Sequence, residues 1–186
     1  MSHVHTKAEA REKMAKAVEH LKNEYKGVRT GRASTALIDH LKVEYYGTPT
    51  PLNQLATLST PEAQMIMIKP FDGNAVKDIE KAIQTSSLGM TPHIDGKFIR
   101  LNVPPLSGER RQQLVQSVKQ MAEQSRVSVR GIRRDAIKMF ESEEKAKNIT
   151  EDQRDEGKEE VEKMTKEHVD QIDELLKQKS AEIMEV

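Results

Sequence analysis

The sequence predicts an α+β protein with two domains and an elongated, L-shaped outline. A three-helix bundle with long antiparallel helices carries a small inserted α/β domain that is mostly β. Two observations lead to this prediction. Apolar residues recur every three or four positions in one segment near the start of the chain and in two long segments after Pro105. Between them, short β-branched runs are bounded by Gly and Pro. We therefore assign residues 1–30 and 105–186 to the bundle and residues 31–104 to the insert.

The first helix is predicted from a stripe of apolar and aromatic residues that steps by 4, 3, 4 and 3 positions. Its members are Met14, Val18, Leu21, Tyr25 and Val28. Side chains at this spacing lie along one side of an α-helix, as they do in a coiled coil. The helix is therefore expected to run to about Val28.

Three segments of the insert have the composition of β-strands bounded by turns. They are LKVEYYGTPTPLNQL, AQMIMIKPFDG and GKFIRLNV. Between the second and the third, the segment NAVKDIEKAIQTSSLG places Val76, Ile79, Ala82 and Ile83 at helical spacing. A short helix is predicted there, and Gly89 is its expected stop.

Two further helices follow the insert. The second helix is expected to begin after Ser107, a candidate N-cap, and to end near Ala146. Its stripe comprises Leu114, Val118, Met121, Ile132, Ala136 and Met139, with Ser125 and Ser128 at intermediate positions. Thr150 is the candidate N-cap of the third helix. The stripe of the third helix comprises Val161, Met164, Val169, Ile172, Leu176 and Ile183. The methionines Met14, Met121, Met139 and Met164 are expected to fill the core.

Two crossing segments, RTGRAS and NVPPLSG, connect the bundle to the insert, and both must lie at the same end of the bundle. We expect them side by side as a two-stranded hinge at residues 29–34 and 102–108. Glycine gives the first strand conformational freedom, whereas two prolines stiffen the second. The predicted hinge residues are Thr30, Gly31, Pro104 and Pro105.

The composition excludes several classes of protein. Thirty Lys and Arg balance thirty Asp and Glu over 186 residues, so any contact with RNA should be local rather than an indiscriminate coating. Aromatic residues make up 3% of the chain, which disfavours a single-strand binder built on base stacking. No cysteine is present, so disulfides, thiolate metal sites and cysteine nucleophiles are excluded.

Neither a membrane span nor a catalytic motif occurs in the sequence. No apolar run approaches the ~18 residues of a membrane helix, and the first residues lack the apolar block of a secretory signal. A cytoplasmic protein without membrane association is therefore expected. The chain has no Walker loop, nucleophile elbow or HExxH motif, so we expect no enzyme activity and no cofactor. The six histidines lack metal-site spacing, and His168 is expected to be packed in the core or to lie at its boundary.

The stretch RVSVRGIRRDAIKMF, residues 126–140, concentrates positive charge in an otherwise balanced chain. Its four arginines are Arg126, Arg130, Arg133 and Arg134. In a helix they fall on one side, and Asp135 is the only acid among them, so the face is expected to be free. Guanidinium groups bind phosphate oxygens bidentately, which suits folded RNA. The alternative is an ordinary solvated surface whose arginines pair with glutamates.

Four motifs resemble those of the bacterial ribosome recycling factor family: VRTGRAS at 28–34, VEYYGTPTPLNQLA at 43–56, NVPPLSGERR at 102–111 and VRGIRRDA at 129–136. They occur in the family's order, and the resemblance covers essentially the whole chain. It implies a cytosolic translation factor that binds the post-termination 70S ribosome at the A and P sites of the 50S subunit, on 23S rRNA. With elongation factor G and GTP, such a factor splits the subunits and releases mRNA and tRNA. A monomer is expected.

The resemblance also implies roles for single arginines. By motif position, arginines of the middle helix and of its start contact rRNA, and a basic pair lies beside the hinge. The expected rRNA-binding residues are Arg130, Arg133, Arg110 and Arg111 by motif, Arg126 and Arg134 from the same helix face, and Arg29 and Arg32 beside the hinge.

The chain departs from the family pattern in two motifs. Ser107 and Gly108 stand where the family commonly has a threonine and an acid, and Gly131 stands where it commonly has an asparagine. Glycine within a helix is unfavourable by roughly 0.5–1 kcal/mol relative to alanine.

A second interpretation does not depend on the resemblance. A coiled-coil scaffold or RNA-binding module has the same helices and insert but no role in subunit splitting. The scaffold predicts weak salt dependence and tolerance of single arginine losses. The factor predicts an affinity for the large subunit that falls steeply with salt.

Overall fold

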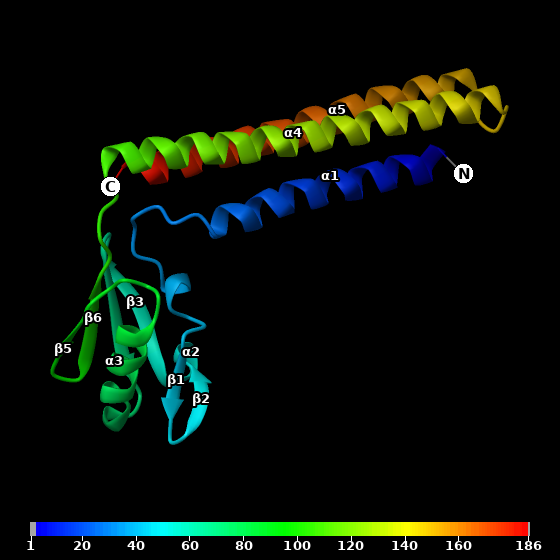
Figure 1. Cartoon of the computed structure of the whole chain (residues 1–186). Coiled ribbons are helices and arrows are strands. Elements are labelled where there is room, and N and C mark those ends of the chain that lie inside the picture. The colour runs from blue at the N-terminus through cyan, green and yellow to red at the C-terminus, as the bar shows by residue number, and fades with distance from the viewer. Residues whose placement is uncertain (1–2, 186) are drawn as a thin grey trace. The chain divides into compact units, whose positions relative to one another are not determined.

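The computed structural model describes residues 3–185 and divides the chain into two compact units. The helical unit contains the residues up to Arg29 and Glu109–Glu185, and the sheet unit contains Thr30–Gly108. Figure 1 shows long helices in the first unit and strands with short helices in the second. The predicted α+β class, with long helices and a small β domain, is confirmed. Thr30 and residues 105–108, which the sequence-based boundary assigned to the bundle, cluster with the sheet unit.

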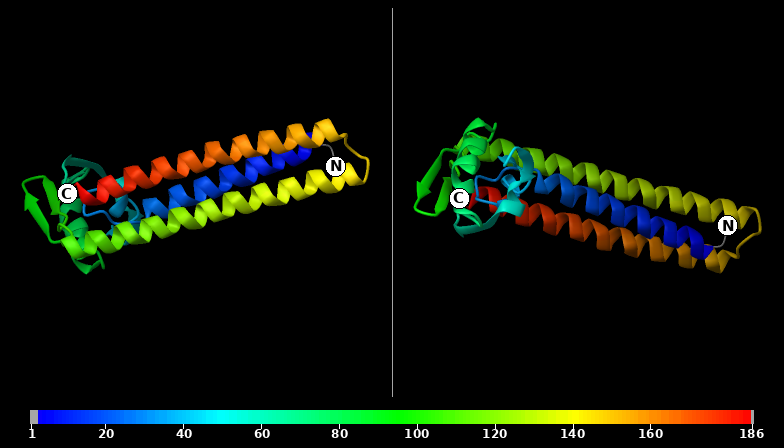
Figure 2. Two further views of the ribbon diagram at one scale, coloured as in Figure 1. Left: turned by 90° about the horizontal axis from the view of Figure 1, so that it is seen from above. Right: turned by 90° about the horizontal axis from the view of Figure 1, so that it is seen from below.

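Three helices form the helical unit: α1 (His3–Lys26), α4 (Gly108–Lys145) and α5 (Glu151–Met184). α4 and α5 are antiparallel and joined by a short connection, and α1 runs beside them in the direction of α5 (Figure 1 and Figure 2). An ion pair of 3.0 Å between Nζ of Lys7 and Oε1 of Glu160 ties the start of α1 to the start of α5. The long antiparallel helices thus pack as a bundle.

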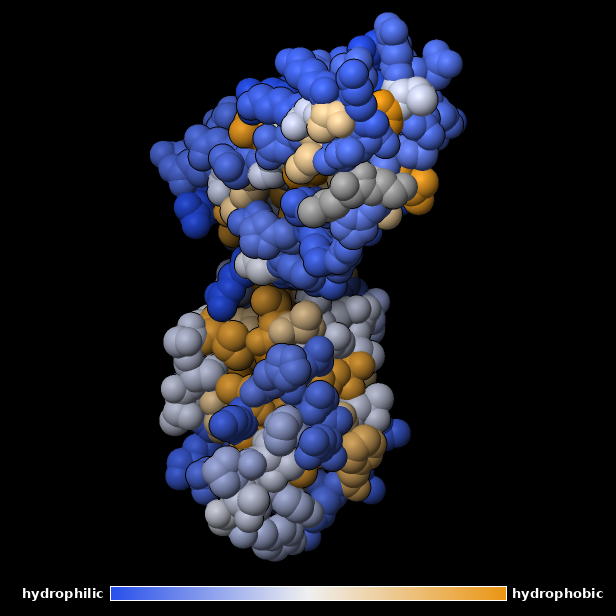
Figure 3. Space-filling model, turned by 90° about the vertical axis from the view of Figure 1, so that its right-hand side faces the viewer, coloured by the Kyte–Doolittle hydropathy of each residue, from blue (hydrophilic) through white to orange (hydrophobic). Residues whose placement is uncertain are grey.

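The core of the helical unit is a narrow stripe to which all three helices contribute. α1 buries Thr6, Ala10, Met14, Val18, Leu21 and Tyr25. α4 buries Val118, Ala122, Ser125, Val129, Ala136 and Phe140. α5 buries Gly157, Val161, Met164, Thr165, His168, Ile172 and Ile183. The remaining surface is charged, and Figure 3 shows that the outside of this unit is largely hydrophilic in that view.

The phenol of Tyr25 forms a hydrogen bond between two helices inside this core. Oη of Tyr25 donates a hydrogen bond of 2.7 Å to the backbone carbonyl of Val118. Burial raises the pKa of Tyr25 to about 12, because the phenolate would lose its hydration there. The bond also aligns the end of α1 with the first third of α4.

The buried stripe of α4 agrees with the predicted one at Val118, Ser125 and Ala136 and is shifted by one position at three others. Ala122, Val129 and Phe140 are buried, whereas Ser128 is exposed and Met139 is 40% exposed. The physical reason is that α4 packs against two helices at once, so the centre of its buried side lies between the positions that face each partner. The prediction that Met139 fills the core is therefore wrong. Met14 and Met164 are buried, and Met121 packs partly buried against the core, as predicted.

The start of α5 follows the prediction at Thr150. Oγ1 of Thr150 accepts a hydrogen bond from the backbone N–H of Gln153, and the side chain of Gln153 accepts one from the backbone N–H of Thr150. This capping box satisfies two helix-terminal donors at once.

The sheet unit contains two antiparallel sheets. β1 (Lys42–Tyr45) and β2 (Thr48–Pro51) form a hairpin. β3 (Ala56–Glu62), β4 (Met65–Pro70), β5 (Pro92–Asp95) and β6 (Phe98–Asn102) form a four-stranded sheet in the order β3-β4-β6-β5. The short helices are α2 (Leu52–Leu55), α3 (Val76–Thr85) and the 3₁₀ turns Thr35–Leu37 and Gly73–Ala75. A second, separate core joins α3 to the strands through residues such as Ile79, Ile83, Ile66 and Ile99.

Two details of this unit bear on the sequence predictions. α3 ends at Thr85, where the backbone N–H of Ser86 bonds to the carbonyl of Ile83, so Gly89 is not the helix stop. Gly89 instead provides a positive φ of 66° in the connection that follows. The β1–β2 turn has positive φ at both Tyr46 and Gly47, the geometry of a tight hairpin.

Both crossing segments are held by the turn between β3 and β4. The N–H of Ala33 donates to the carbonyl of Ala63 at 2.7 Å, and the N–H of Val103 donates to the carbonyl of Gln64 at 2.8 Å. Gly31 has φ +78° and lies so near Leu106 that an added Cβ would be 3.1 Å from Cγ of Leu106. The two segments therefore lie against each other within the sheet unit.

Two helical glycines should respond oppositely to alanine. A Cβ at buried Gly157 would lie 2.9–3.1 Å from ring atoms of Phe140, so Gly157→Ala should lower the free energy of unfolding by about 1–3 kcal/mol. Apart from its chain neighbours and the backbone of its own helix, nothing lies within 4 Å of a Cβ at Gly131, so Gly131→Ala should raise the free energy of unfolding by about 0.5–1 kcal/mol. Urea denaturation followed by circular dichroism measures both. Equal stability of Gly157→Ala and wild type would mean that the ring of Phe140 moves aside.

Candidate functional site

α4 carries the arginines that the sequence analysis singled out, and the structure separates them by their partners. The buried stripe of α4 contacts α1 and α5, so a side chain next to the stripe can reach a neighbouring helix, whereas one on the far side reaches only solvent. α4 has nine Lys and Arg against six Asp and Glu, and α5 has six against twelve. The acidic helix therefore lies beside the basic one.

Arg126 is fixed between the two helices. Its Nε and Nη2 donate to Oδ1 of Asp173 at 2.9 and 2.6 Å, and its Nη1 donates to Oε2 of Glu123 at 2.9 Å. Burial disfavours the charged guanidinium, but hydrogen bonds to Asp173 and Glu123 outweigh it and raise the pKa of Arg126 above its ordinary value. The side chain is 18% exposed. The expectation that this arginine is free for a ligand is wrong.

Arg130 and Arg133 are partly engaged. Nη1 of Arg130 lies 3.5 Å from Oε1 of Glu123, and the side chain is half exposed. Nη1 of Arg133 donates to Oε2 of Glu162 on α5 at 3.3 Å, whereas its Nε is buried without a hydrogen-bond partner among the described residues. Both guanidiniums keep donors that a ligand could use.

Arg134 points away from the other two helices. It is exposed, as are Lys119 and Lys138 on the same helix, and none of the three has an ion pair among residues 3–185. Together with Arg130 and Arg133 they form the basic face of α4, the name used below for Lys119, Arg130, Arg133, Arg134 and Lys138. Such donors can bind several phosphate groups along a folded RNA.

The other predicted arginines lie apart from this face. Arg110 and Arg111 occupy the first turn of α4, where Nη1 of Arg110 donates to Oε1 of Gln113 at 3.1 Å. The bond between Tyr25 and Val118 places the end of α1 near the start of α4, so exposed Arg29 lies at the same end of the bundle. Arg32 belongs to the sheet unit and is half-buried.

Sequence reasoning missed the acidic partners of the arginines. Glu123 was detectable, because it lies three residues before Arg126 on the same helix. Asp173 and Glu162 lie on α5, and no spacing within α4 indicates them. The hypothesis that the arginines pair with acidic side chains is therefore right for Arg126. The hypothesis of an unpaired surface is right for Arg134 among the described residues.

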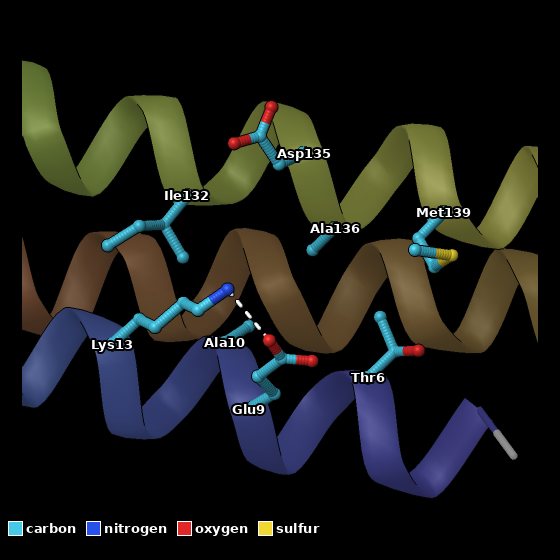
Figure 4. Close-up of a pocket in the computed structure, with 8 residues that line it drawn as sticks. All are labelled: Thr6, Glu9, Ala10, Lys13, Ile132, Asp135, Ala136 and Met139. Carbon is cyan, nitrogen blue, oxygen red and sulfur yellow. Dashed lines mark ion pairs between the residues drawn. The ribbon is translucent and has the colours of Figure 1, made fainter. Parts of the chain in front are cut away.

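A surface hollow of the helical unit lies between α1 and α4. Its floor is apolar, with Ala10, Ile132 and Ala136, and the ion pair of Glu9 with Lys13 crosses its edge (Figure 4). Figure 4 shows Asp135 and Met139 on the opposite edge, which explains the exposure of Met139. The hollow contains none of the predicted arginines.

Other candidate chemistry is limited in the described part of the chain. No three His, Asp or Glu side chains within residues 3–185 are grouped so that they could hold a metal ion. His168 is buried as expected, and its Nδ1 donates to the carbonyl of Met164 at 2.7 Å. None of the helices in residues 3–185 combines the length and the hydropathy that a membrane crossing requires.

The fold and this surface define a class of protein: a three-helix bundle that carries an inserted sheet domain and a basic face on its longest helix. The ribosome recycling factor family has a model that matches residues 21–184, and the chain belongs to this family. The resemblance found in four sequence motifs is thereby confirmed.

Individual relatives agree over nearly the full length. The chain is 50% identical over 178 residues to the ribosome-recycling factor of Desulfosudis oleivorans, covering 96% of each protein. It is 49% identical over 177 residues to that of Caldicellulosiruptor saccharolyticus, covering 95% of this chain and 96% of the relative.

Solved structures show the same likeness. A solution structure of the ribosome recycling factor matches with a TM-score of 0.76 and 43% identity, covering 100% of this chain and 99% of the other. A second match, with a TM-score of 0.65 and 42% identity, covers 99% of this chain and 100% of the other. It comes from models for the T. thermophilus ribosome recycling factor and the E. coli elongation factor G bound to the E. coli post-termination complex.

Arg126, which is ion-paired, and Arg134, which is exposed, should respond differently to substitution by alanine. Arg126→Ala removes contacts to two carboxylates across α4 and α5 and should lower the free energy of unfolding by about 1–2 kcal/mol. Arg134→Ala should change it by less than about 0.5 kcal/mol, because that side chain is exposed and unpaired among the described residues. Thermal and urea denaturation distinguish the two. A larger loss for Arg134→Ala would contradict its placement on the outside.

Proposed function

We propose that this protein splits post-termination ribosomes together with elongation factor G and GTP, releasing mRNA and tRNA for a new round of translation. The observation that carries this proposal is the match of nearly the whole chain to ribosome recycling factors. A structural neighbour that covers the whole fold is placed with elongation factor G on the post-termination complex. A scaffold without a role in splitting is not favoured by these comparisons.

The proposed docking partner is 23S rRNA of the 50S subunit, at the A and P sites. Arg130, Arg133 and Arg134 of the basic face donate to phosphates, while Arg126 holds α4 on α5 and so supports the face indirectly. Arg29, Arg110 and Arg111 form a second contact at the other end of α4, and Arg32 contributes from the sheet unit. Folded rRNA suits these contacts, because guanidinium groups recognise backbone oxygens without reading base edges.

The proposed mechanism assigns no chemical step to this chain. GTP hydrolysis by elongation factor G supplies the free energy for splitting, and this protein transmits it by rigid-body motion. We propose that it acts in the cytoplasm as a monomer, without a cofactor and not as an enzyme.

The proposed hinge lies at residues 29–34 and 102–108. The hydrogen bonds of Ala33 and Val103 to the β3–β4 turn hold the inner part of each crossing segment to the sheet unit. On the other side, Val28 bonds to the carbonyl of Tyr25 and packs against the bundle core. Rotation is thereby concentrated in the first segment near Thr30 and Gly31. In the second crossing segment, rotation occurs after Pro104 and Pro105, near Gly108.

Splitting of purified bacterial post-termination ribosomes tests the proposal. Light scattering should fall when this protein, elongation factor G and GTP are all present, and not when any one is omitted. Affinity for the 50S subunit should decrease steeply with salt, because docking releases counterions from rRNA. Arg134→Ala should weaken binding at low salt while it leaves the fold intact. No splitting with an active, matched elongation factor G would overturn the proposed function.

The hinge can be stiffened without disturbing α4. Gly108 is the first residue of α4, a position that tolerates proline because its N–H has no helical partner. Gly108→Pro should leave affinity for the 50S subunit unchanged and slow splitting several-fold, and Gly108→Ala is the control for loss of glycine alone. Splitting by Gly108→Pro at the wild-type rate would remove rotation at this residue from the mechanism.

A further inference from the structure

Arg133 is held less completely than Arg126, although both reach from α4 to a carboxylate of α5. Arg126 uses three nitrogens in contacts of 2.6–2.9 Å. Among residues 3–185, Arg133 has one ion pair, of 3.3 Å, with Glu162, and its side chain is 32% exposed. The Arg126 contact is a fixed part of the bundle, whereas the Arg133 contact can exchange its partner.

The second observation is the unsatisfied donor of Arg133. Its Nε is buried and has no hydrogen-bond partner among the described residues, which is unfavourable for a charged group. Rotation of the guanidinium away from Glu162 and toward solvent would bring Nε to an external acceptor. A phosphate could then bind Nε and Nη2 together, in the side-on bidentate geometry that guanidinium groups favour.

Glu162 opposes this exchange without preventing it. Its side chain is 53% exposed, so water hydrates the carboxylate when the ion pair opens, and the loss of an exposed pair is small. The carboxylate nevertheless remains beside the place where the phosphate docks. The negative charges of the Glu162 carboxylate and of a docked phosphate repel each other, so Glu162 lowers the affinity of the basic face for RNA.

We propose that Glu162 of α5 competes with RNA phosphate for Arg133 and thereby limits how tightly the basic face of α4 binds the ribosome. The inference rests on the proposed function, because it concerns the same arginine. The competition should increase the rate at which the protein dissociates from the ribosome. A factor that must leave the ribosome after each round benefits from an internal carboxylate that recaptures the guanidinium and speeds dissociation.

The test compares two glutamate variants of the full chain for binding to purified 50S subunits. Glu162→Gln should bind about two- to fivefold more tightly than wild type and dissociate more slowly. Glu159→Gln removes the same charge from the same helix, at an exposed residue without an ion pair among the described residues, and should change affinity little. Unchanged or weaker binding by Glu162→Gln, or an equal gain by Glu159→Gln, would overturn the inference.

A double-mutant cycle shows whether the effect passes through Arg133. In an Arg133→Ala background, Glu162→Gln should no longer increase affinity. An undiminished gain would mean that Glu162 acts as a general negative charge, which contradicts the proposal. Circular dichroism establishes that each variant is folded. Salt-independent or absent binding of the wild type would instead defeat the proposed function itself, and the inference with it.

Discussion

The packing of three highly charged helices around one narrow apolar stripe is the constraint on which the helical unit depends. Each helix can bury only one side, so the stripe decides which residues face a neighbour and which face water. At Gly157 the approach of α5 to Phe140 leaves no space for a Cβ. The same packing places Arg126 and Arg133 at the border with α5 and leaves Arg134 outside.

Ion pairing then divides the arginines of α4 into those that link helices and those that lie exposed without an ion pair among the described residues. Arg126, with two carboxylates, acts as a link between helices, and its charge is already compensated. Arg134 has no such compensation within the described residues and is available to a ligand. Arg133 lies between these two cases, because a single ion pair with Glu162 compensates its charge in part. A chain with no net charge can therefore present a basic face, because the acids of α5 neutralise some arginines and not others.

The sheet unit is stabilised by its own core and by strand pairing, so its stability does not depend on the bundle stripe. Both connections to the rest of the chain are hydrogen-bonded to one β-turn, at Ala63 and Gln64. A single turn thereby sets where each connection leaves the unit.

By itself, the sequence determined the α+β class, the three amphipathic helices, the N-cap at Thr150 and the family. These follow from local spacing, capping chemistry and motifs, which are properties of neighbouring residues. Tertiary structure alone decided the phase of the α4 stripe, the exposure of Met139 and the partners of Arg126 and Arg133. Each depends on which helices lie beside α4 and on acids of α5 that are distant in sequence. Spacing within one helix shows which residues share a side, but it contains no information about what that side contacts.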